Sequence, residues 1–212
     1  MPPPRRPSTS SKSSELEPSE IEPREILSFW FDQTTPKQWF IKSDAFDQLI
    51  AERFRAVLAA ALDGRMNGRL NRRLDGRMDG WANHAEGCLA LILVLDQFTR
   101  HIYRDSPCAF VGDDHALRLS AHAVHAGWVA NCAQVSRRQF FLMPMMHSED
   151  VEVQRASLPL FETYTDSDTL WFAKRHCEII ERFGRFPHRN AVLGRVSTTD
   201  EIEFLKEPGS AF

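Results

Sequence analysis

The sequence predicts an all-α protein, and three features of its apolar residues indicate this class. Several stretches repeat apolar residues every three or four positions, which is the spacing of one face of an α-helix. Capping residues precede these stretches and glycines follow them, as at Ser43 and Gly64. The longest apolar run, residues 88–95, is rich in Leu and Ala and lies in a stretch of about twenty residues without Pro, which favours a helix over a buried strand.

Composition indicates one domain of a soluble protein. The chain has 212 residues, of which 42% are hydrophobic and 26% charged, so it can bury one sizeable core. A net charge of -3 argues against nucleic acid or an anionic membrane as an obligate partner. No apolar run is long enough to span a bilayer, so no membrane is expected. The 4 cysteines form no C-x-x-C motif, which, with the lack of a secretory signal, predicts a reducing compartment and a cytoplasmic protein.

Two segments are expected to lie outside the packed domain. Residues 1–22 contain repeated Pro and Ser and almost nothing apolar, which predicts a disordered tail before a single all-helical domain over residues 23–212. Residues 64–80 repeat a G-R-M or G-R-L unit, which predicts an Arg-rich insertion in the form of a solvated loop or a frayed extension of the preceding helix. We assign no chemistry to either segment.

The first expected helices are rich in aromatic residues. Residues 25–31 predict a short helix, and residues 36–41 place Trp39 and Phe40 where they can cover one end of the core. Ser43 is a natural N-cap for the clearest amphipathic helix, which is expected to end at Gly64. The apolar positions of that helix are Phe46, Leu49, Ile50, Phe54, Val57, Leu58, Ala61 and Leu62.

Residues 84–104 form the stretch around which the other helices are expected to pack. A helix that is apolar on every side lies inside a protein. Farther along the same helical line, Asp96, Arg100 and Arg104 fall four apart and predict a ladder of ion pairs. These charges either close the edge of the core or form a ligand site, and the pattern leaves both alternatives open.

The next helix is expected from Asp113 or Asp114 to about Gly127, where glycine suits a left-handed cap. Its expected inward residues are Ala116, Leu117, Ala121, Val124 and Trp128. The opposite stripe holds His115, His122 and His125, of which two lie three apart and could share a metal ion. We expect them to face solvent instead, because no acidic or cysteine ligand for a metal accompanies them.

Residues 138–146 form an apolar segment that leads to His147. This imidazole either donates to a buried carbonyl or faces a cavity, and both readings remain open. Ser148 is the expected N-cap of the following helix, and Pro159 is expected to kink or split that helix. The inward residues expected there are Val153, Ala156, Leu160, Phe161 and Tyr164.

The last third of the chain predicts two helices joined by a basic loop. The first runs from about Ser167 to Phe183, and its His176 points along the apolar stripe as a hydrogen-bonded or neutral core histidine. Gly184 ends it and begins a loop, residues 185–190, whose two arginines and imidazole suit an anion and whose Phe-Pro bond could be cis. Thr198 and Glu201 then form the capping box of a short helix through Leu205.

Five motifs in a fixed order carry a family resemblance. They are LALILVLDQF at 89–98, R-x-I-Y-R at 100–104, FLMPMMHSED at 141–150 with Gln154 after it, H-x-x-I-I-x-R-F-G-R-F-P-H-R-N at 176–190, and L-G-R-x-S-T-x-x-E at 193–201. Together they resemble the bacterial family called domain of unknown function 924 from about Glu25 to Leu205. The resemblance implies stacked antiparallel helix pairs in a tetratricopeptide-like superhelix. The chain departs from the family at Thr99 and His101, where Pro and Asn are usual, and in its Arg-rich insertion.

Polar residues from three distant segments are expected to line one cavity. A charge at the end of a buried helix is costly unless it is paired or solvated, and a shared polar pocket satisfies several such ends together. The residues predicted to line it are Asp96, Gln97, Arg100, Arg104, His147, Glu149, Gln154, His176, Arg185, His188, Arg189 and Asn190. Surplus arginine in this pocket would attract an anion.

The favoured function is binding of a small anionic ligand, or of a peptide or protein partner, in this cavity. Stacked helix pairs build concave surfaces, and guanidinium groups suit carboxylates and phosphates. Binding is favoured over catalysis because the sequence has no nucleophile elbow, H-E-x-x-H, phosphate loop or nucleotide fingerprint.

The alternative is an enzyme, hydrolytic or metal-assisted, with His147 or His188 as the general acid or base. In this alternative Glu149 orients the histidine. The arginines that would neutralise developing negative charge are Arg100, Arg185 and Arg189. The conceivable metal ligands are His147, His176, His188 and an acidic residue, but their separation in sequence gives no ligand spacing, so we assign no metal. The cofactor stays unknown.

Overall fold

The computed structural model describes residues 21–66 and 80–211, and within these ranges every regular element is helical. The all-α prediction is therefore confirmed. The elements are α1 (Pro23–Asp32), α2 (Pro36–Phe40), α3 (Asp44–Met66), α5 (Ala85–Ile92), the π-helix η1 (Leu93–Phe98), α6 (Thr99–Ile102), the 3-10 helix η2 (Pro107–Phe110), α7 (Asp113–His125), α8 (Trp128–Asn131), α9 (Val135–Met146), α10 (Val151–Tyr164), α11 (Ser167–Phe183), the 3-10 helix η3 (Pro187–Arg189) and α12 (Thr199–Phe204).

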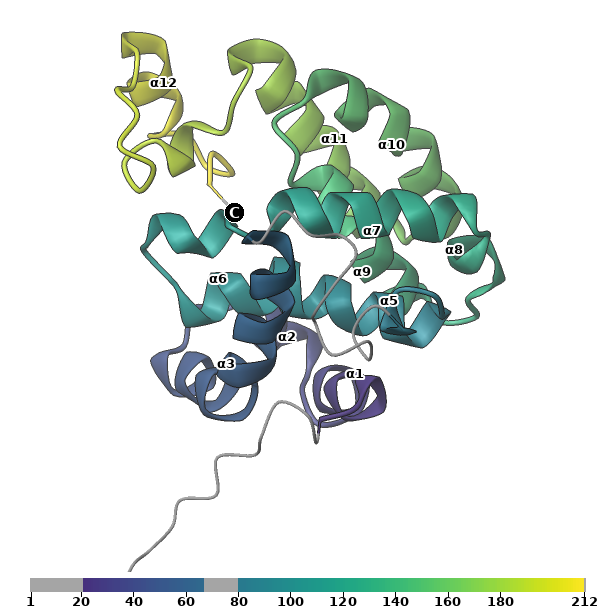
Figure 1. The fold of residues 1–212 in the computed structure, drawn as a ribbon. Helices are drawn as coiled ribbons and strands as arrows, with labels where there is room; N and C mark the ends of the chain where they lie inside the picture. Colours follow the sequence, from purple (N-terminus) through teal and green to yellow (C-terminus); the bar gives the residue numbers. More distant parts are fainter. Residues whose placement is uncertain (1–20, 67–79, 212) are drawn as a thin grey trace, which may run out of the picture.

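The continuous stretch α5, η1 and α6 is the centre of the fold (Figure 1). α1, α3, α7 and α9 pack against it, and α10 and α11 extend this core as a second layer beyond α9. Residues 87–99 are all buried, as the apolar run predicts. The consecutive contacts of α9 with α10 and of α10 with α11 agree with stacked helix pairs, while the tetratricopeptide-like superhelix stays a prediction.

Leu93 lies fully buried in this central stretch. Leu93→Ala is therefore expected to lower the free energy of unfolding by about 3 kcal/mol, because it removes a large side chain from a close-packed interior. Urea denaturation measures the change, and Leu49→Ala on the exposed face of α3 is the control, with an expected cost below about 1 kcal/mol. Equal costs for the two variants would contradict the central position of α5 and η1.

A π-helix lies within the stretch that was predicted to carry the ion-pair ladder, and the ladder is only partly formed. The hydroxyl of Thr99 donates to the carbonyl of Leu95 at 2.9 Å, and Nη1 of Arg100 donates to the carbonyl of Asp96 at 2.5 Å. Side chains thus satisfy carbonyls in the wider turn, where the ordinary α-helical pairing is changed. Arg100 still pairs with Asp96, but Arg104 lies beyond the end of α6 and binds Asp47 instead.

The aromatic cluster at the start of the chain covers one end of the core, as predicted. Trp39 is buried, stacks on Trp30 with ring centroids 6.0 Å apart, and packs edge-on against Phe140. Phe40 was expected to pack in the same way, but Phe40 is 59% exposed. The difference arises because α2 is a single short turn that can bury one of two adjacent side chains.

Several sequence-based boundaries need correction. Ile21, assigned to the tail, is buried in the core, whereas the rest of the predicted tail up to residue 20 and most of the predicted insertion, residues 67–79, lie outside the described residues. α3 continues to Met66, past Gly64. Asp150, rather than Ser148, caps α10, since its carboxylate accepts from the N–H groups of Glu152 and Val153.

The inward faces of two helices also differ from the predicted stripes. α7 buries Ala116, Leu119, Ser120 and Ala123, and α10 buries Gln154, Ser157 and Phe161. Small polar residues can face the interior because their hydrogen bonds are made there, as Ser120 donates to the carbonyl of Phe141. Pro159 lies within α10, which runs unbroken through it.

The predicted helix from Ser167 to Phe183 is confirmed at both ends. Asp166 caps its start, and Gly184 ends it with a φ of 68°. The Phe186–Pro187 bond is trans, and the capping box of Thr198 and Glu201 begins α12 as predicted. In Figure 1, α12 lies at the upper left and the chain after it returns towards the middle of the molecule. Among the described helices, none has the length and apolarity required to cross a bilayer.

Candidate functional site

A cavity of about 730 Å³ opens between α2, the central stretch, α9, α11 and η3. Its lining comes from residues as far apart in sequence as Pro36 and Ala211. The basic and amide side chains that line it are Gln97, Arg100, His101, Arg104, His147, His176, His188 and Arg189. The large apolar side chains that line it are Trp39, Phe40, Ile41, Phe110, Met143, Met146 and Phe172. The acidic side chains that line it are Asp105, Asp166 and Asp168. The cavity therefore has a polar part, rich in guanidinium and imidazole groups, and a broad apolar part.

Asp96 is the buried carboxylate behind the polar part of the cavity. It has no exposed surface, and its Oδ1 lies 2.7 Å from Nδ1 of His147 and 3.2 Å from Nη1 of Arg100. Burial alone would raise the pKa of Asp96, but the charge of Arg100 and the contact with His147 outweigh burial and lower it. Asp96 is thus an anion at neutral pH.

Asp113 joins Arg100 to Arg189 on the same side of the cavity. The guanidinium of Arg100 donates two hydrogen bonds to the Asp113 carboxylate, at 3.0 and 3.1 Å, and Nη1 of Arg189 lies 3.4 Å from it. Gly112 allows this arrangement, because a Cβ there would lie 2.0 Å from the carbonyl oxygen of Leu95. The start of α7 can therefore approach the π-helix closely enough for Asp113 to reach Arg100.

Arg189 is held between two aromatic rings. Its guanidinium carbon lies 4.8 Å from the ring centre of Phe110 and 4.5 Å from that of Phe186, which are distances of cation–π contact. The residue is buried, and its Nε is a buried donor without a hydrogen-bond partner among the described residues. Burial and then the charge of Arg100 lower the pKa of Arg189 to about 10, so it stays protonated at neutral pH.

Three histidines that line the cavity are neutral at pH 7. Burial is the largest cause, and it lowers the pKa of His147, lowers that of His176 to about 3 and lowers that of His188 to about 4. Nδ1 of His176 lies 2.8 Å from the carbonyl of Phe172, so this nitrogen carries the proton and donates. Nδ1 of His147 likewise donates to the ionised Asp96.

A second, half-buried ion cluster adjoins the cavity at the end of α6. Asp47 accepts from Nε of Arg104 at 2.5 Å and from Nη2 at 2.8 Å, and its Oδ1 lies 2.6 Å from Nδ1 of His101. Burial would raise the pKa of Asp47, but the bonds to Arg104 and His101 lower it. This cluster ties α3 to α6, and Arg104 reaches the cavity as a paired side chain.

The structure brings eight of the twelve predicted residues together. Seven line the cavity, namely Gln97, Arg100, Arg104, His147, His176, His188 and Arg189, while Asp96 lies directly behind His147 and Arg100. Arg100, His147 and His188 thus line one cavity, although their segments are far apart in sequence.

The other four predicted residues stabilise nearby loops rather than lining the cavity. Glu149 accepts two hydrogen bonds from Arg195 and one from the N–H of Phe186, so it holds the loop after α11 and does not orient a histidine. Arg185 binds Glu201 with two hydrogen bonds. Gln154 donates to two backbone carbonyls, those of Met146 and Ser148. Asn190 bonds to Ser197 and Arg195, which fastens the same loop.

The sequence-based set omitted several residues that build the cavity. Asp113 was assigned only as a helix start, and Phe110 was not among the candidates, because their partner Arg189 lies far away in sequence. An acidic residue directly after the glycine of a turn was the available signal for Asp113. His101, Met143 and the apolar wall of α2 and α11 gave no signal beyond ordinary packing.

The described histidine, cysteine and acidic residues include no group of three or more placed to hold a metal ion. His122, on the outer stripe of α7, packs edge-on against the ring of Trp128.

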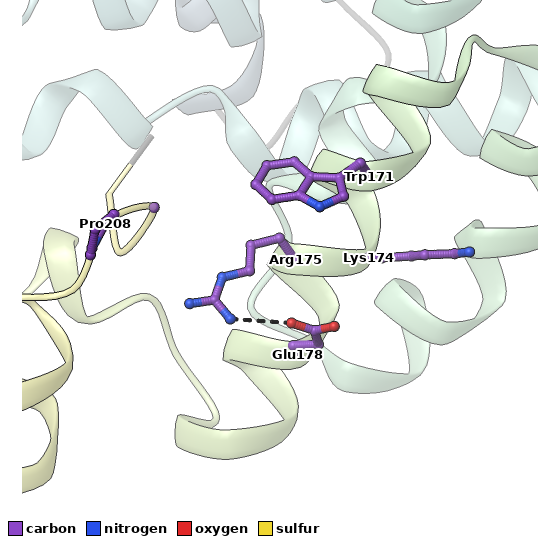
Figure 2. A pocket seen from close by; sticks show the side chains of 6 residues that line it. Trp171, Lys174, Arg175, Glu178 and Pro208 are labelled. Atoms are coloured by element: carbon purple, nitrogen blue, oxygen red, sulfur yellow. Dashed lines mark hydrogen bonds and ion pairs between the residues drawn. The ribbon is translucent and has the colours of Figure 1, made fainter.

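A second hollow, of about 370 Å³, lies between α11 and the chain after α12, and Figure 2 shows Trp171 and Arg175 on one side of it and Pro208 on the other. Arg175 pairs with Glu178 at 3.2 Å across one helical turn, and we assign this hollow no ligand.

Comparison with known proteins gives a family and a fold. The chain matches the family described as "Bacterial protein of unknown function (DUF924)" over residues 26–209, which confirms the resemblance carried by its motifs. It is similar to the solved structure of the protein of unknown function ATU0120 from Agrobacterium tumefaciens, with 34% identity and a TM-score of 0.76. The match covers 87% of this chain and 96% of that one. None of the curated proteins compared with the chain matches it.

Proposed function

Because the chain belongs to this bacterial family, whose description names no ligand or reaction, we propose a function from its cavity: it binds a small molecule with one anionic group and an apolar portion. The observation that carries the proposal is Arg189, a buried guanidinium at the cavity whose Nε has no partner among the described residues. A buried donor without a partner costs free energy that an anionic ligand can recover.

Around Arg100 and Arg189 the positive charge is balanced, which differs from the surplus that the sequence predicted. What these side chains have in excess is N–H donors. Arg100 and Arg189 are matched in charge by Asp96 and Asp113, and the three cavity histidines are neutral, so this part of the cavity has no net charge. Each guanidinium nevertheless has five N–H donors. Arg189 donates to Asp113 at 3.4 Å, and its Nε has no partner among the described residues. A neutral site rich in donors favours a singly charged carboxylate over a doubly charged phosphate.

The apolar wall supports a ligand with an apolar portion. Phe40, Ile41 and Phe172 line the cavity and are 59%, 45% and 44% exposed, so apolar surface remains uncovered at a concave site. A ligand that covers these side chains gains their burial. The volume also lies in the range of roughly 300–1,000 Å³ that small-molecule pockets occupy, which favours a small molecule over a protein partner.

Binding of 3-phenylpropanoate tests the proposal. It is expected to raise the melting temperature, whereas 3-phenylpropanol, which lacks the charge, is expected to leave it unchanged. Arg189→Gln is expected to weaken binding by about 10- to 100-fold, which corresponds to the loss of a charge-assisted hydrogen bond. Isothermal titration calorimetry measures this change. Asp113 keeps its two bonds to Arg100 in the variant, so the fold is expected to persist.

Arg118→Gln, at an exposed position of α7, is the matched control and is expected to bind as the unsubstituted protein does. Equal affinities of Arg189→Gln and the control would contradict the proposal. So would binding of the alcohol as tightly as the carboxylate.

A further inference from the structure

We infer that the cavity is also a hydrolytic active site, in which His147 acts as general base and activates a water molecule against a carboxylic ester bound through its anionic end at Arg189. His147 lines the cavity, and its Nδ1 lies 2.7 Å from the fully buried Asp96. The substrate is held by the same Arg189 contact as the proposed ligand, so the hydrolase rests on the proposed function.

The contact with Asp96 sets the chemistry of His147. An ionised carboxylate at Nδ1 requires the proton there, which leaves the lone pair of the neutral ring on Nε2. Nε2 is then the ring nitrogen available to a water molecule in the cavity. Because burial and Arg100 lower the pKa of His147, the ring is a free base at neutral pH.

Asp96 also distinguishes His147 from its neighbour His176. The two rings lie 6.3 Å apart, but Nδ1 of His176 donates to a backbone carbonyl, which is neutral. A carboxylate stabilises the imidazolium that forms when the base accepts a proton, and a carbonyl does so much less. His147 is therefore the better base, and Asp96 is its positioning residue.

The local charges favour acyl chemistry. Arg100 contacts the same Oδ1 of Asp96 that binds His147, so its positive charge lies beside the base. One such charge suits the single oxyanion that forms when a carbonyl is attacked. Phosphoryl transfer distributes more negative charge and usually relies on metal ions, for which the described residues form no cluster.

The reaction balances with water as the co-reactant. Nε2 of His147 takes a proton from water as the water oxygen bonds to the carbonyl carbon, and the carbonyl oxygen becomes an oxyanion beside Arg100. The oxyanion then re-forms the carbonyl, the bond from carbon to the alkoxy oxygen breaks, and the leaving alcohol takes the proton from Nε2. One ester and one water give one carboxylic acid and one alcohol, and His147 returns to its neutral form.

Hydrolysis of the mono-4-nitrophenyl ester of glutaric acid tests the inference, because it joins an ester to one carboxylate and releases a coloured phenol. The protein is expected to hydrolyse this ester faster than 4-nitrophenyl butyrate, which lacks the carboxylate. His147→Gln is expected to lower kcat/KM by about 10²- to 10⁴-fold, the usual contribution of a general base. The control His125→Gln, at an exposed position of α7, is expected to have no effect.

Three readouts separate a chemical role from a structural one. His147→Gln is expected to bind 3-phenylpropanoate within about twofold of the unsubstituted protein, because the ligand contacts Arg189. Arg189→Gln is expected to raise KM. In the unsubstituted protein kcat/KM is expected to fall with acid below the ordinary histidine pKa of about 6.5, and Asp96→Asn is expected to move that midpoint to lower pH.

The outcomes distinguish the inference from the proposed function. No hydrolysis of the glutarate ester above the buffer rate, or no effect of His147→Gln on it, overturns the hydrolase and leaves binding of the anion intact. Failure of 3-phenylpropanoate to bind overturns the proposed function itself. If His147→Gln does not fold, the pH dependence of the unsubstituted protein decides, measured at the pH values where denaturation curves show that it is folded: a kcat/KM that does not fall with acid over that range overturns the histidine base.

Discussion

Asp96→Ala is expected to lower the free energy of unfolding by about 3 to 5 kcal/mol, because it leaves two guanidinium groups, those of Arg100 and Arg189, with the single carboxylate of Asp113 between them. Asp96 is fully buried, and it holds both Arg100 and the Nδ1 proton of His147. Arg100 would keep Asp113 as a partner, whereas His147 would lose the carboxylate that it contacts. Urea denaturation at pH 7.5 measures the change.

Asp105→Ala is the control for this prediction. Asp105 pairs with Lys42 at 3.0 Å, but both side chains are well exposed, so its removal is expected to cost less than about 1 kcal/mol. Similar costs for the two aspartate variants would show that solvent reaches Asp96 and would remove the basis for a buried Asp96–His147 pair.

Acid is expected to destabilise the protein strongly between pH 6.5 and about 4. Burial lowers the pKa of His176 from 6.5 to about 3 and, together with Arg189, lowers that of His188 from 6.5 to about 4. Below pH 6.5 these two histidines therefore bind protons in the unfolded chain but stay neutral in the folded protein. The stability that is present above pH 6.5 is lost as the pH falls. At 1.36 kcal/mol per pKa unit, the two histidines together are expected to remove on the order of 5 kcal/mol by about pH 4.5.

Denaturation curves at pH 7.5, 6, 5 and 4.5 test this expectation. His176→Gln and His188→Gln are each expected to make the free energy of unfolding depend less steeply on pH, while His125→Gln, on the exposed end of α7, is expected to leave the slope unchanged. A free energy of unfolding that stays constant from pH 6.5 to 4.5 would mean that these imidazoles are protonated in the folded protein.

Local signals in the sequence predicted the fold where both ends of a helix were marked. The helix from Ser167 to Phe183 has a capping aspartate before it and a glycine after it, and the prediction matches α11 at both ends. The apolar run placed the central stretch correctly, but a π turn has the same composition as an α turn, so η1 was not predictable. Arg104 was assigned to a ladder that ends at Arg100, because the end of α6 at Ile102 was not predicted either.

The candidate site was predictable only in part, because its key pairs join distant segments. His147 and Asp96 are 51 residues apart, and Arg189 and Asp113 are 76 apart, so no local spacing could connect them. Charged residues at the ends of apolar segments still identified Asp96, Arg100 and His147 as candidates. The same rule also selected Glu149 and Arg185, whose partners are Arg195, after η3, and Glu201, in the first turn of α12.

The dispersed lining of the cavity bears on how the protein acquires its function during synthesis. Residues from Pro36 to Ala211 contribute to a single cavity, and the arginine between two phenylalanine rings comes from η3, which follows every described helix except α12. A nascent chain that has folded through α9 would still lack Phe186, Arg189 and the wall from α11. Such an intermediate would expose Phe40, Met143 and Met146 to other nascent chains, so the half-made cavity is the surface on which a chaperone would be expected to act.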